Sequence, residues 1–256
     1  MVKVREDYAT SGNGEVDIGQ WVSHIAQQTH LDNPEQLRRA CEKAAVIDLE
    51  AFREDRQWAP GASSFLTGLE MAQVLAELRM DQASLVAAVL YRCVREERVP
   101  LEDIRKEFGD EVAALINGVQ QMAAISSIHH PLKGNVLGQS EGQLDNVRKM
   151  LVTMVDDVRV ALIKLAERTS AIRAVKDAPD EKRMRVAREV FDIYAPLAHR
   201  LGIGHIKWEL EDLSFRYLHA TAYKKIAKLL DEKRLDRDRY IKRVIETLQT
   251  ELTASG

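Results

Sequence analysis

The segment "VRVALIKLAERTSAIR", Val158 to Arg173, decides what kind of core this chain builds. Its apolar residues keep helical spacing, and they are frequent enough to predict a helix that lies in the interior. Lys164, Glu167 and Arg168 interrupt the apolar pattern at i, i+3 and i+4, so all three fall near one face. Charges on a buried helix are costly unless they are paired. The segment therefore predicts a catalytic pocket, a structural ion-pair network or the remains of a pocket.

Helical patterns also fill most of the remaining chain. The sequence "NPEQ" at residues 33–36 offers an N-cap, a proline at N1 and a capping-box glutamine, and it predicts a helix that runs to about Phe52. Asp81 caps a further helix that ends before Pro100, and Gly109 closes a short one. No useful strand alternation and no internal repeat is present. The chain is predicted to be all-α, a bundle of about ten or more helices with no sizeable sheet.

Composition limits the classes of function. The chain has 256 residues, of which 45% are hydrophobic and 30% charged, so it can bury a large core. A net charge of -3 gives no global basic footprint for nucleic acid. No segment approaches the roughly 18 apolar residues of a membrane helix, and the first residues lack a signal-peptide core. Cys41 and Cys93 show no metal or disulfide spacing. We expect a cytoplasmic protein that binds neither nucleic acid nor membrane directly.

Two local motifs favour structural roles over chemical ones. His129 and His130 could ligate a metal, but no ligand at suitable spacing supports them, and the Gly- and Pro-rich residues 126–142 predict a mobile loop. Gly202 and Gly204 in "RLGIGH" resemble part of a phosphate loop, yet their flanks are helical, which favours a turn between two helices.

Two charged segments near the C-terminal end are also predicted to be structural. In "WELEDL", residues 208–213, we expect Trp208, Leu210 and Leu213, together with Phe215, to pack inward while the carboxylates are solvated. The run "DEKRLDRDRYIKR", residues 231–243, mixes both signs, and it predicts a solvated helix face rather than a nucleic-acid surface.

Four blocks of sequence carry a family resemblance. They are "EDIRKEFGDEVAALINGV", "DNVRKML", "KLAERTSAIR" and "YAPLAHRLGIGHIKWELEDLSFRYL". From about residue 35 onward the chain resembles the N-terminal portion of the RelA/SpoT family of guanosine tetra- and pentaphosphate enzymes. The resemblance implies an HD-type hydrolase fold, in which a divalent metal, usually manganese, activates water to remove the 3′-pyrophosphate. It also implies a synthetase domain, absent from this chain, that transfers pyrophosphate from ATP to GTP. The implied layout is an extension at 1–33, an HD-type domain at 34–195 and a helical extension at 196–256.

The resemblance assigns the hydrolase positions one by one. An active member carries "HP" on the second helix, "HD" and then "ED" on the third, and the aspartate of "KLAD" in the segment quoted first. The corresponding residues here are Thr67, Gly68, Tyr91, Arg92, Arg95, Glu96 and Glu167. The asparagine that follows a turn later is Ala171, and the basic residues of "RxSG" are lost in "WAPG", residues 58–61.

These replacements predict a pseudo-hydrolase. An arginine keeps its charge at cellular pH, and its charge would repel a divalent ion. We therefore expect no catalytic residue and no metal in this domain, as in the RelA branch, whose members resemble synthetases with a degenerate hydrolase domain. We hypothesise that Arg92 occupies the former metal position and pairs with Glu167 or Glu96, while Arg168 and Lys164 extend the network.

Two alternatives stay open at this point. One is a residual hydrolase that uses a displaced metal held by Glu96, Glu167 and His129. The other is a nucleotide-binding module without chemistry, in which three cations would hold the phosphates of a guanosine polyphosphate. These cations are Lys164, Arg168 and Arg173. The expected partner is the synthetase domain of the same protein, and any ribosome association would involve only regions absent from this chain.

Overall fold

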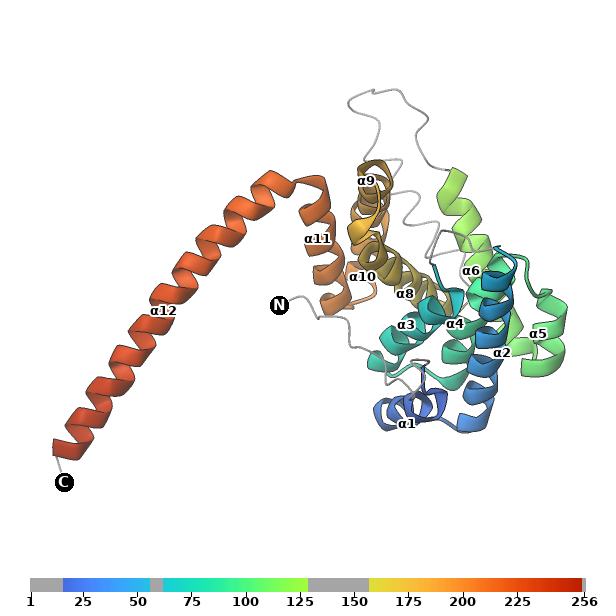
Figure 1. Ribbon diagram of the computed structural model, residues 1–256, viewed down its shortest axis with the longest axis horizontal. Coiled ribbons are helices and arrows are strands. Elements are labelled where there is room, and N and C mark those ends of the chain that lie inside the picture. Colours follow the sequence, from blue (N-terminus) through green and yellow to red (C-terminus); the bar gives the residue numbers. More distant parts are fainter. Residues whose placement is uncertain (1–15, 56–61, 129–156, 255–256) are drawn as a thin grey trace.

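The computed structural model describes residues 16–55, 62–128 and 157–254. These residues form eleven α-helices and no β-sheet, which confirms the predicted all-α class (Figure 1). The first six helices are α1 (Ile18–Gln28), α2 (Pro34–Arg53), α3 (Ser64–Glu77), α4 (Gln82–Arg95), α5 (Leu101–Phe108) and α6 (Asp110–Ile128). The others are α8 (Val158–Ala174), α9 (Asp180–Glu189), α10 (Ala195–Arg200), α11 (Gly204–Leu218) and α12 (Ala220–Ala254). A 3-10 turn (Val175–Asp177) and a π turn (Val190–Tyr194) join α8 to α9 and α9 to α10. No helix among the described residues is long and apolar enough to span a membrane.

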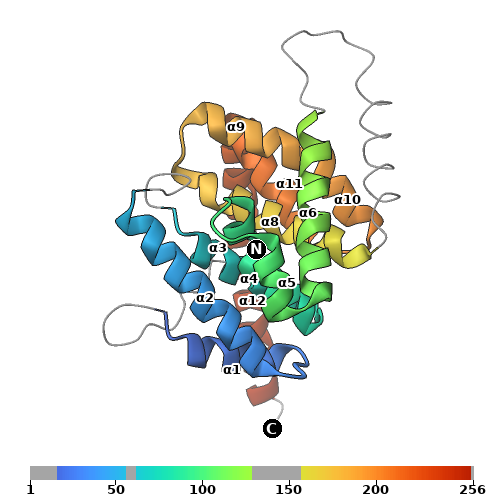
Figure 2. The ribbon, with the colours of Figure 1, turned by 90° about the vertical axis from the view of Figure 1, so that its right-hand side faces the viewer.

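The core lies where α3, α4 and α8 meet (Figures 1 and 2). Helix α3 packs along α4, and α8 packs against α3, α4 and α6. Apolar side chains from each of the three central helices are fully buried, among them Leu69, Leu90 and Ile163. Helix α2 covers α4 from the other side, and α1 packs on α2 and α3 through Trp21 and Ile25. This packing fixes the position of α8, which carries the charged residues quoted first.

The helix ends follow most of the signals in the sequence. The Asp81 carboxylate accepts a backbone hydrogen bond in the first turn of α4, and Gly109 ends α5 with a φ of 98°. Helix α2 begins at the predicted proline, but the capping box is wrong. The Asn33 side chain makes no cap bond, and the Gln36 amide instead donates to the Phe108 carbonyl oxygen at 3.2 Å. The Asn33 N–H, which the box would join to Gln36, instead donates to the side-chain oxygen of Gln82 in α4 at 2.7 Å. Contacts with α4 and α5 thus replace the local one.

The turn between α10 and α11 was predicted correctly, but one side chain beyond it was not. Gly202 takes a φ of 75°, a conformation that favours glycine, and α11 begins two residues later. Leu210 and Leu213 are buried as expected, whereas 68% of Trp208 is exposed. Trp208 precedes Leu210 by two residues, about 200° around the helix, so the two side chains lie on opposite faces. Only one face of α11 packs on the bundle, and Phe215 is half-buried beside it.

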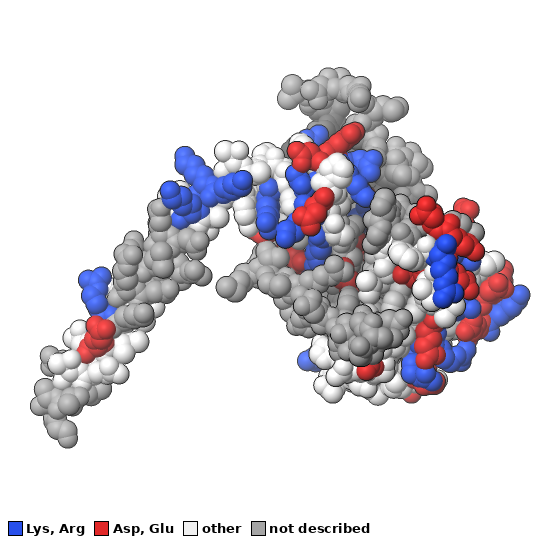
Figure 3. Space-filling view, in the orientation of Figure 1, with Lys and Arg blue, Asp and Glu red and all other residues white. Residues whose placement is uncertain are grey.

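Helix α12 leads away from the bundle, and its main packing contact is with α11 (Figure 1). At about 100° per residue, its exposed large apolar side chains fall on one face of the helix. They are Ile226, Leu229, Leu230, Tyr240, Ile241, Val244, Ile245 and Leu248. We call this set the α12 stripe. Figure 3 shows lysines and arginines gathered at the start of α12, while the bundle carries both signs of charge interspersed.

Several sequence predictions fall partly or wholly outside the described residues. Helix α6 runs to residue 128, so the predicted loop does not begin at residue 126. The rest of that loop, with His129 and His130, lies outside, as do residues 58–61 and the block "DNVRKML", residues 145–151. The domain limits at 33 and 195 stay predictions.

Candidate functional site

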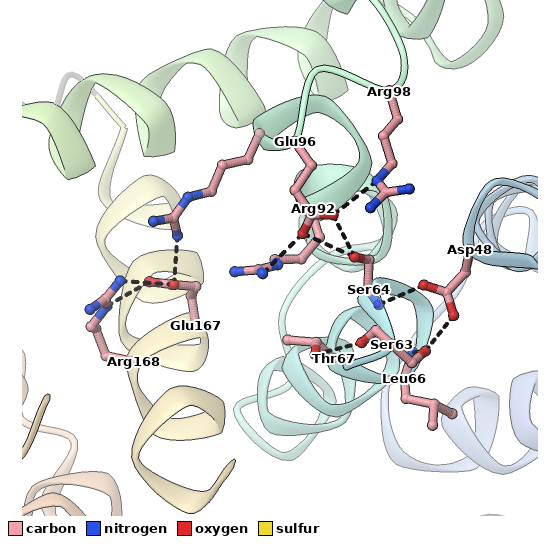
Figure 4. Close-up of polar contacts among 11 residues, drawn as sticks. Asp48, Ser63, Ser64, Leu66, Thr67, Arg92, Glu96, Arg98, Glu167 and Arg168 are labelled. Carbon is pink, nitrogen blue, oxygen red and sulfur yellow. Dashed lines mark hydrogen bonds and ion pairs between the residues drawn. The ribbon is translucent and has the colours of Figure 1, made fainter. Parts of the chain in front are cut away.

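The degenerate hydrolase positions converge where the start of α3, the end of α4 and the middle of α8 approach one another (Figure 4). Ser64 and Thr67 come from α3, Arg92 from α4, and Glu167 from α8. The structure therefore brings these elements together as the resemblance implied. Ion pairs occupy the space between them.

Glu167 is the centre of the first ion-pair group, and only 3% of its side chain is exposed. Its carboxylate accepts hydrogen bonds from Arg95 Nη1 at 2.9 Å and from Lys164 Nζ at 2.8 Å. Arg168 adds two more, from Nε at 2.6 Å and from Nη2 at 2.9 Å. Three cations from two helices thus surround one buried carboxylate, and we call this group the Glu167 cluster.

Electrostatics keeps this cluster ionised at neutral pH. Burial alone would raise the pKa of Glu167, but the charges of Arg168 and Lys164 hold that pKa well below its ordinary value of 4.5. Burial lowers the pKa of Lys164 to about 8, which still leaves the amine protonated at pH 7. Arg168 also bonds Glu189 of α9 at 3.1 Å. The cluster therefore joins α4, α8 and α9.

Glu96 is the centre of a second group at the end of α4. Its carboxylate forms an ion pair with Arg92 Nη2 at 2.9 Å and accepts a hydrogen bond from Arg98 Nε at 3.0 Å. The Ser64 hydroxyl donates to both of its oxygens, at 2.9 and 2.8 Å. The predicted pairing of Arg92 is therefore confirmed for Glu96 and not for Glu167, which Arg95 contacts instead. That Arg92 occupies a former metal position stays a prediction.

Thr67 and Tyr91, two of the degenerate positions, belong to neither the Glu167 cluster nor the group around Glu96. The Thr67 hydroxyl donates to the Ser63 carbonyl oxygen of its own helix at 2.8 Å. Tyr91 is fully buried, and the guanidinium of Arg95 lies 6.0 Å from its ring centroid. Burial raises the pKa of Tyr91, so its hydroxyl stays neutral. Neither side chain supplies an anionic or imidazole donor.

Asp48 of α2 is a site residue that the sequence did not single out. Its carboxylate accepts from the Ser63 hydroxyl and from the Ser64 backbone N–H, both at 2.7 Å. Ser63 in turn caps α3 by accepting from the Leu66 N–H at 2.9 Å. The sequence offered one signal for this contact, the pair of serines at the start of the apolar helix α3. The N–H groups at such a helix start attract a hydrogen-bond acceptor. Asp48 thus already occupies the anion-binding end of α3.

The three residues considered for phosphate binding all contact carboxylates. Lys164 and Arg168 belong to the Glu167 cluster. Arg173 follows Arg168 by five residues, about 140° around the helix, so it serves a different face. It bonds Glu209 of α11 and Glu70 of α3. Glu209, predicted to be solvated, is therefore paired, because α11 turns this side chain toward α8.

The residues at the position where the resemblance places a metal do not fit a divalent cation. The described ranges hold no group of three histidine, cysteine or acidic side chains that could bind a metal. The two acids present, Glu96 and Glu167, each face arginine side chains that remain charged. A metal here would have to displace several buried cations first. The donor set thus favours ion pairs over metal coordination.

Replacing Arg92 with alanine is expected to lower the free energy of unfolding by about 1–2 kcal/mol. The change removes one partner of a mostly buried carboxylate, but Glu96 keeps its bonds to Arg98 and Ser64. Urea denaturation of both proteins measures the difference. If the free energy of unfolding fell as much as it does when a buried carboxylate loses all its partners, Arg98 and Ser64 would not be compensating for the lost arginine.

The Glu167 cluster also predicts how stability depends on acid. The pKa of Glu167 is lower in the folded than in the unfolded chain, so its stabilisation is complete above pH 4.5 and is lost as the pH falls toward the folded-state pKa. In Glu167→Gln this contribution is absent at every pH. The difference in free energy of unfolding between the native protein and Glu167→Gln should therefore become smaller from neutral pH to about pH 3.5. Urea midpoints across that range test it, and a constant gap would contradict it.

Fold and site together define an all-α domain of the HD class, in which ion pairs lie between α3, α4 and α8. A family model described as "HD domain" matches residues 44–204, and the chain belongs to this family. It is 42% identical over its whole length to the GTP pyrophosphokinase of Escherichia coli strain K12 and 38% identical to that of Photobacterium angustum. The enzyme of the same name from Haemophilus influenzae is 45% identical over 68% of the chain. These relatives confirm the resemblance to the RelA/SpoT family. The chain spans only about a third of the length of the first two.

Proposed function

We propose that this chain is a catalytically inactive HD-type domain of a longer GTP pyrophosphokinase of the RelA type, with a structural and regulatory role toward the synthetase domain. The longer protein would transfer pyrophosphate from ATP to GTP, as the names of its relatives indicate. This chain alone would neither make nor hydrolyse guanosine polyphosphates.

One observation carries the proposal. On α8, Glu167 stands where active relatives are implied to carry a metal-binding aspartate. Its carboxylate accepts hydrogen bonds from Lys164, Arg168 and Arg95. A hydrolase needs that carboxylate for a divalent cation that polarises water. Here its oxygens are already occupied by protein cations. The cluster holds α4, α8 and α9 in place, which is a scaffold's function.

Catalytic silence is the direct test. The purified chain, incubated with guanosine tetraphosphate and manganese, is expected to release no pyrophosphate above the rate of a protein-free blank. An active HD-type hydrolase in the same buffer serves as the positive control. Manganese-dependent turnover that disappears in Glu167→Gln would overturn the proposal, and it would favour the residual hydrolase.

A nucleotide-binding module is the second candidate, and the small excess of cations in the site favours it. Five cations, Arg92, Arg95, Arg98, Lys164 and Arg168, stand against four acids, Asp48, Glu96, Glu167 and Glu189. Arg95 is the most accessible of them, with 38% of its side chain exposed. Calorimetric titration with guanosine tetraphosphate separates the two candidates. A saturable heat that weakens in Arg95→Ala would support binding, and no heat would support the scaffold.

A further inference from the structure

Arg173 joins three helices that are far apart in the sequence. It lies near the end of α8, and its Nε and Nη2 donate to the two carboxylate oxygens of Glu209 on α11 at 2.6 and 2.8 Å. Its Nη1 donates to Glu70 on α3 at 3.3 Å. A two-point bond between a guanidinium and a carboxylate fixes direction as well as distance. One side chain thus ties α11 to both α3 and α8.

We propose that Arg173 is a latch that holds α11, and with it the base of α12, on the bundle formed by α3 and α8. Helix α12 has its main packing contact with α11, so whatever fixes α11 also fixes the direction in which α12 leaves the domain. The α12 stripe then projects from the domain in one fixed direction. This role concerns a position outside the former metal site, and it would stand even if the domain hydrolysed nucleotides.

The charges around Arg173 make the latch more than a passive contact. Glu70 and Glu209 are both mostly buried, and Arg173 stands between them. Burial alone would lower the pKa of Arg173, but the hydrogen bond and charge of Glu209, together with Glu70, raise it, so the guanidinium remains charged. Without the arginine, two carboxylates on α3 and α11 would face each other at low dielectric. Repulsion between these like charges then adds to the loss of the bonds in weakening the attachment of α11 to α3.

Hydrogen exchange of the whole chain, followed by mass spectrometry, tests the latch. In Arg173→Ala, amide exchange in α11 and in residues 220–230 is expected to rise about tenfold or more, while exchange in α2 and α4 stays within about twofold. Arg173→Lys keeps the charge but cannot form the two-point bond, and it should give an intermediate rise. Lys207→Ala is the matched control, since Lys207 pairs with Glu211 inside α11 at 2.9 Å. It should leave the exchange of α11 within about twofold.

A rescue variant separates a latch from a general packing role. Adding Glu209→Gln to Arg173→Ala removes the repulsion between the carboxylates, so the exchange of α11 should fall back by at least about threefold. An unchanged α11 in Arg173→Ala overturns the proposal. So does a rise spread equally over α2, α4 and α11, because that would report lost global stability. Failure of the rescue removes the electrostatic part of the proposal.

Discussion

Replacing Glu167 with alanine is expected to lower the free energy of unfolding by about 3–5 kcal/mol, because it leaves buried charges without their counter-charge. Lys164 loses its hydrogen-bond acceptor while only 1% of its side chain is exposed. Arg168 keeps Glu189 but loses both bonds to Glu167. Since the amine of Lys164 is buried in the native fold, losing its acceptor destabilises the folded state. Equilibrium denaturation in urea at pH 7 measures the loss.

Two further variants show whether the cost comes from a stranded charge. The double variant Lys164→Met with Glu167→Leu removes the most buried cation together with the carboxylate. It should cost less than Glu167→Ala alone, because Arg168 keeps Glu189 and Arg95 is partly exposed to water. Glu211→Ala removes a carboxylate from a more exposed pair with Lys207, and it should change stability by about 0.5 kcal/mol or less. If Glu167→Ala cost less than about 1 kcal/mol, the cluster would not be a scaffold.

The sequence predicted the Glu167 cluster in outline because local spacing determines which charges share a helix face. Lys164, Glu167 and Arg168 lie within about one turn, so their proximity needs no knowledge of the fold. The choice between Arg92 and Arg95 as the partner of Glu167 depends on how α4 is rotated against α8. That rotation follows from the packing of whole helices, which no local pattern in the chain specifies.

The same limit explains the errors on α11. The apolar positions of "WELEDL" suggested an inward face, but Trp208 and Leu210 cannot both point inward on one helix. Glu209 looked solvated because its partner, Arg173, is 36 residues away in the sequence. Helix starts fared better, since the cap of α4 uses a residue next to the helix it caps. Contacts between distant elements, such as Asp48 with Ser63, were not predictable from spacing.

Gly68 is the one described glycine at which an added Cβ would meet backbone atoms of another helix. Gly68→Ala is therefore expected to lower the free energy of unfolding by about 2 kcal/mol. A Cβ at this position would lie 2.6 Å from the Val89 carbonyl oxygen and 3.0 Å from the Val89 Cα. Both are backbone atoms, so they cannot move aside as a flexible side chain would. The better helix propensity of alanine, worth up to about 1 kcal/mol, offsets only part of the strain. Thermal or urea unfolding measures the net loss.

Gly204→Ala is the matched control, because a Cβ there meets no atom within 4 Å. It should be neutral or stabilising by a few tenths of a kcal/mol. Gly68 also lies one turn from Ser64, whose hydroxyl bonds Glu96, so moving α3 away from α4 should lengthen that contact. Combining Gly68→Ala with Ser64→Ala should therefore cost less than the sum of the two single changes. Full additivity, or a neutral Gly68→Ala, would show that α3 can shift without disturbing the ion pairs at the end of α4.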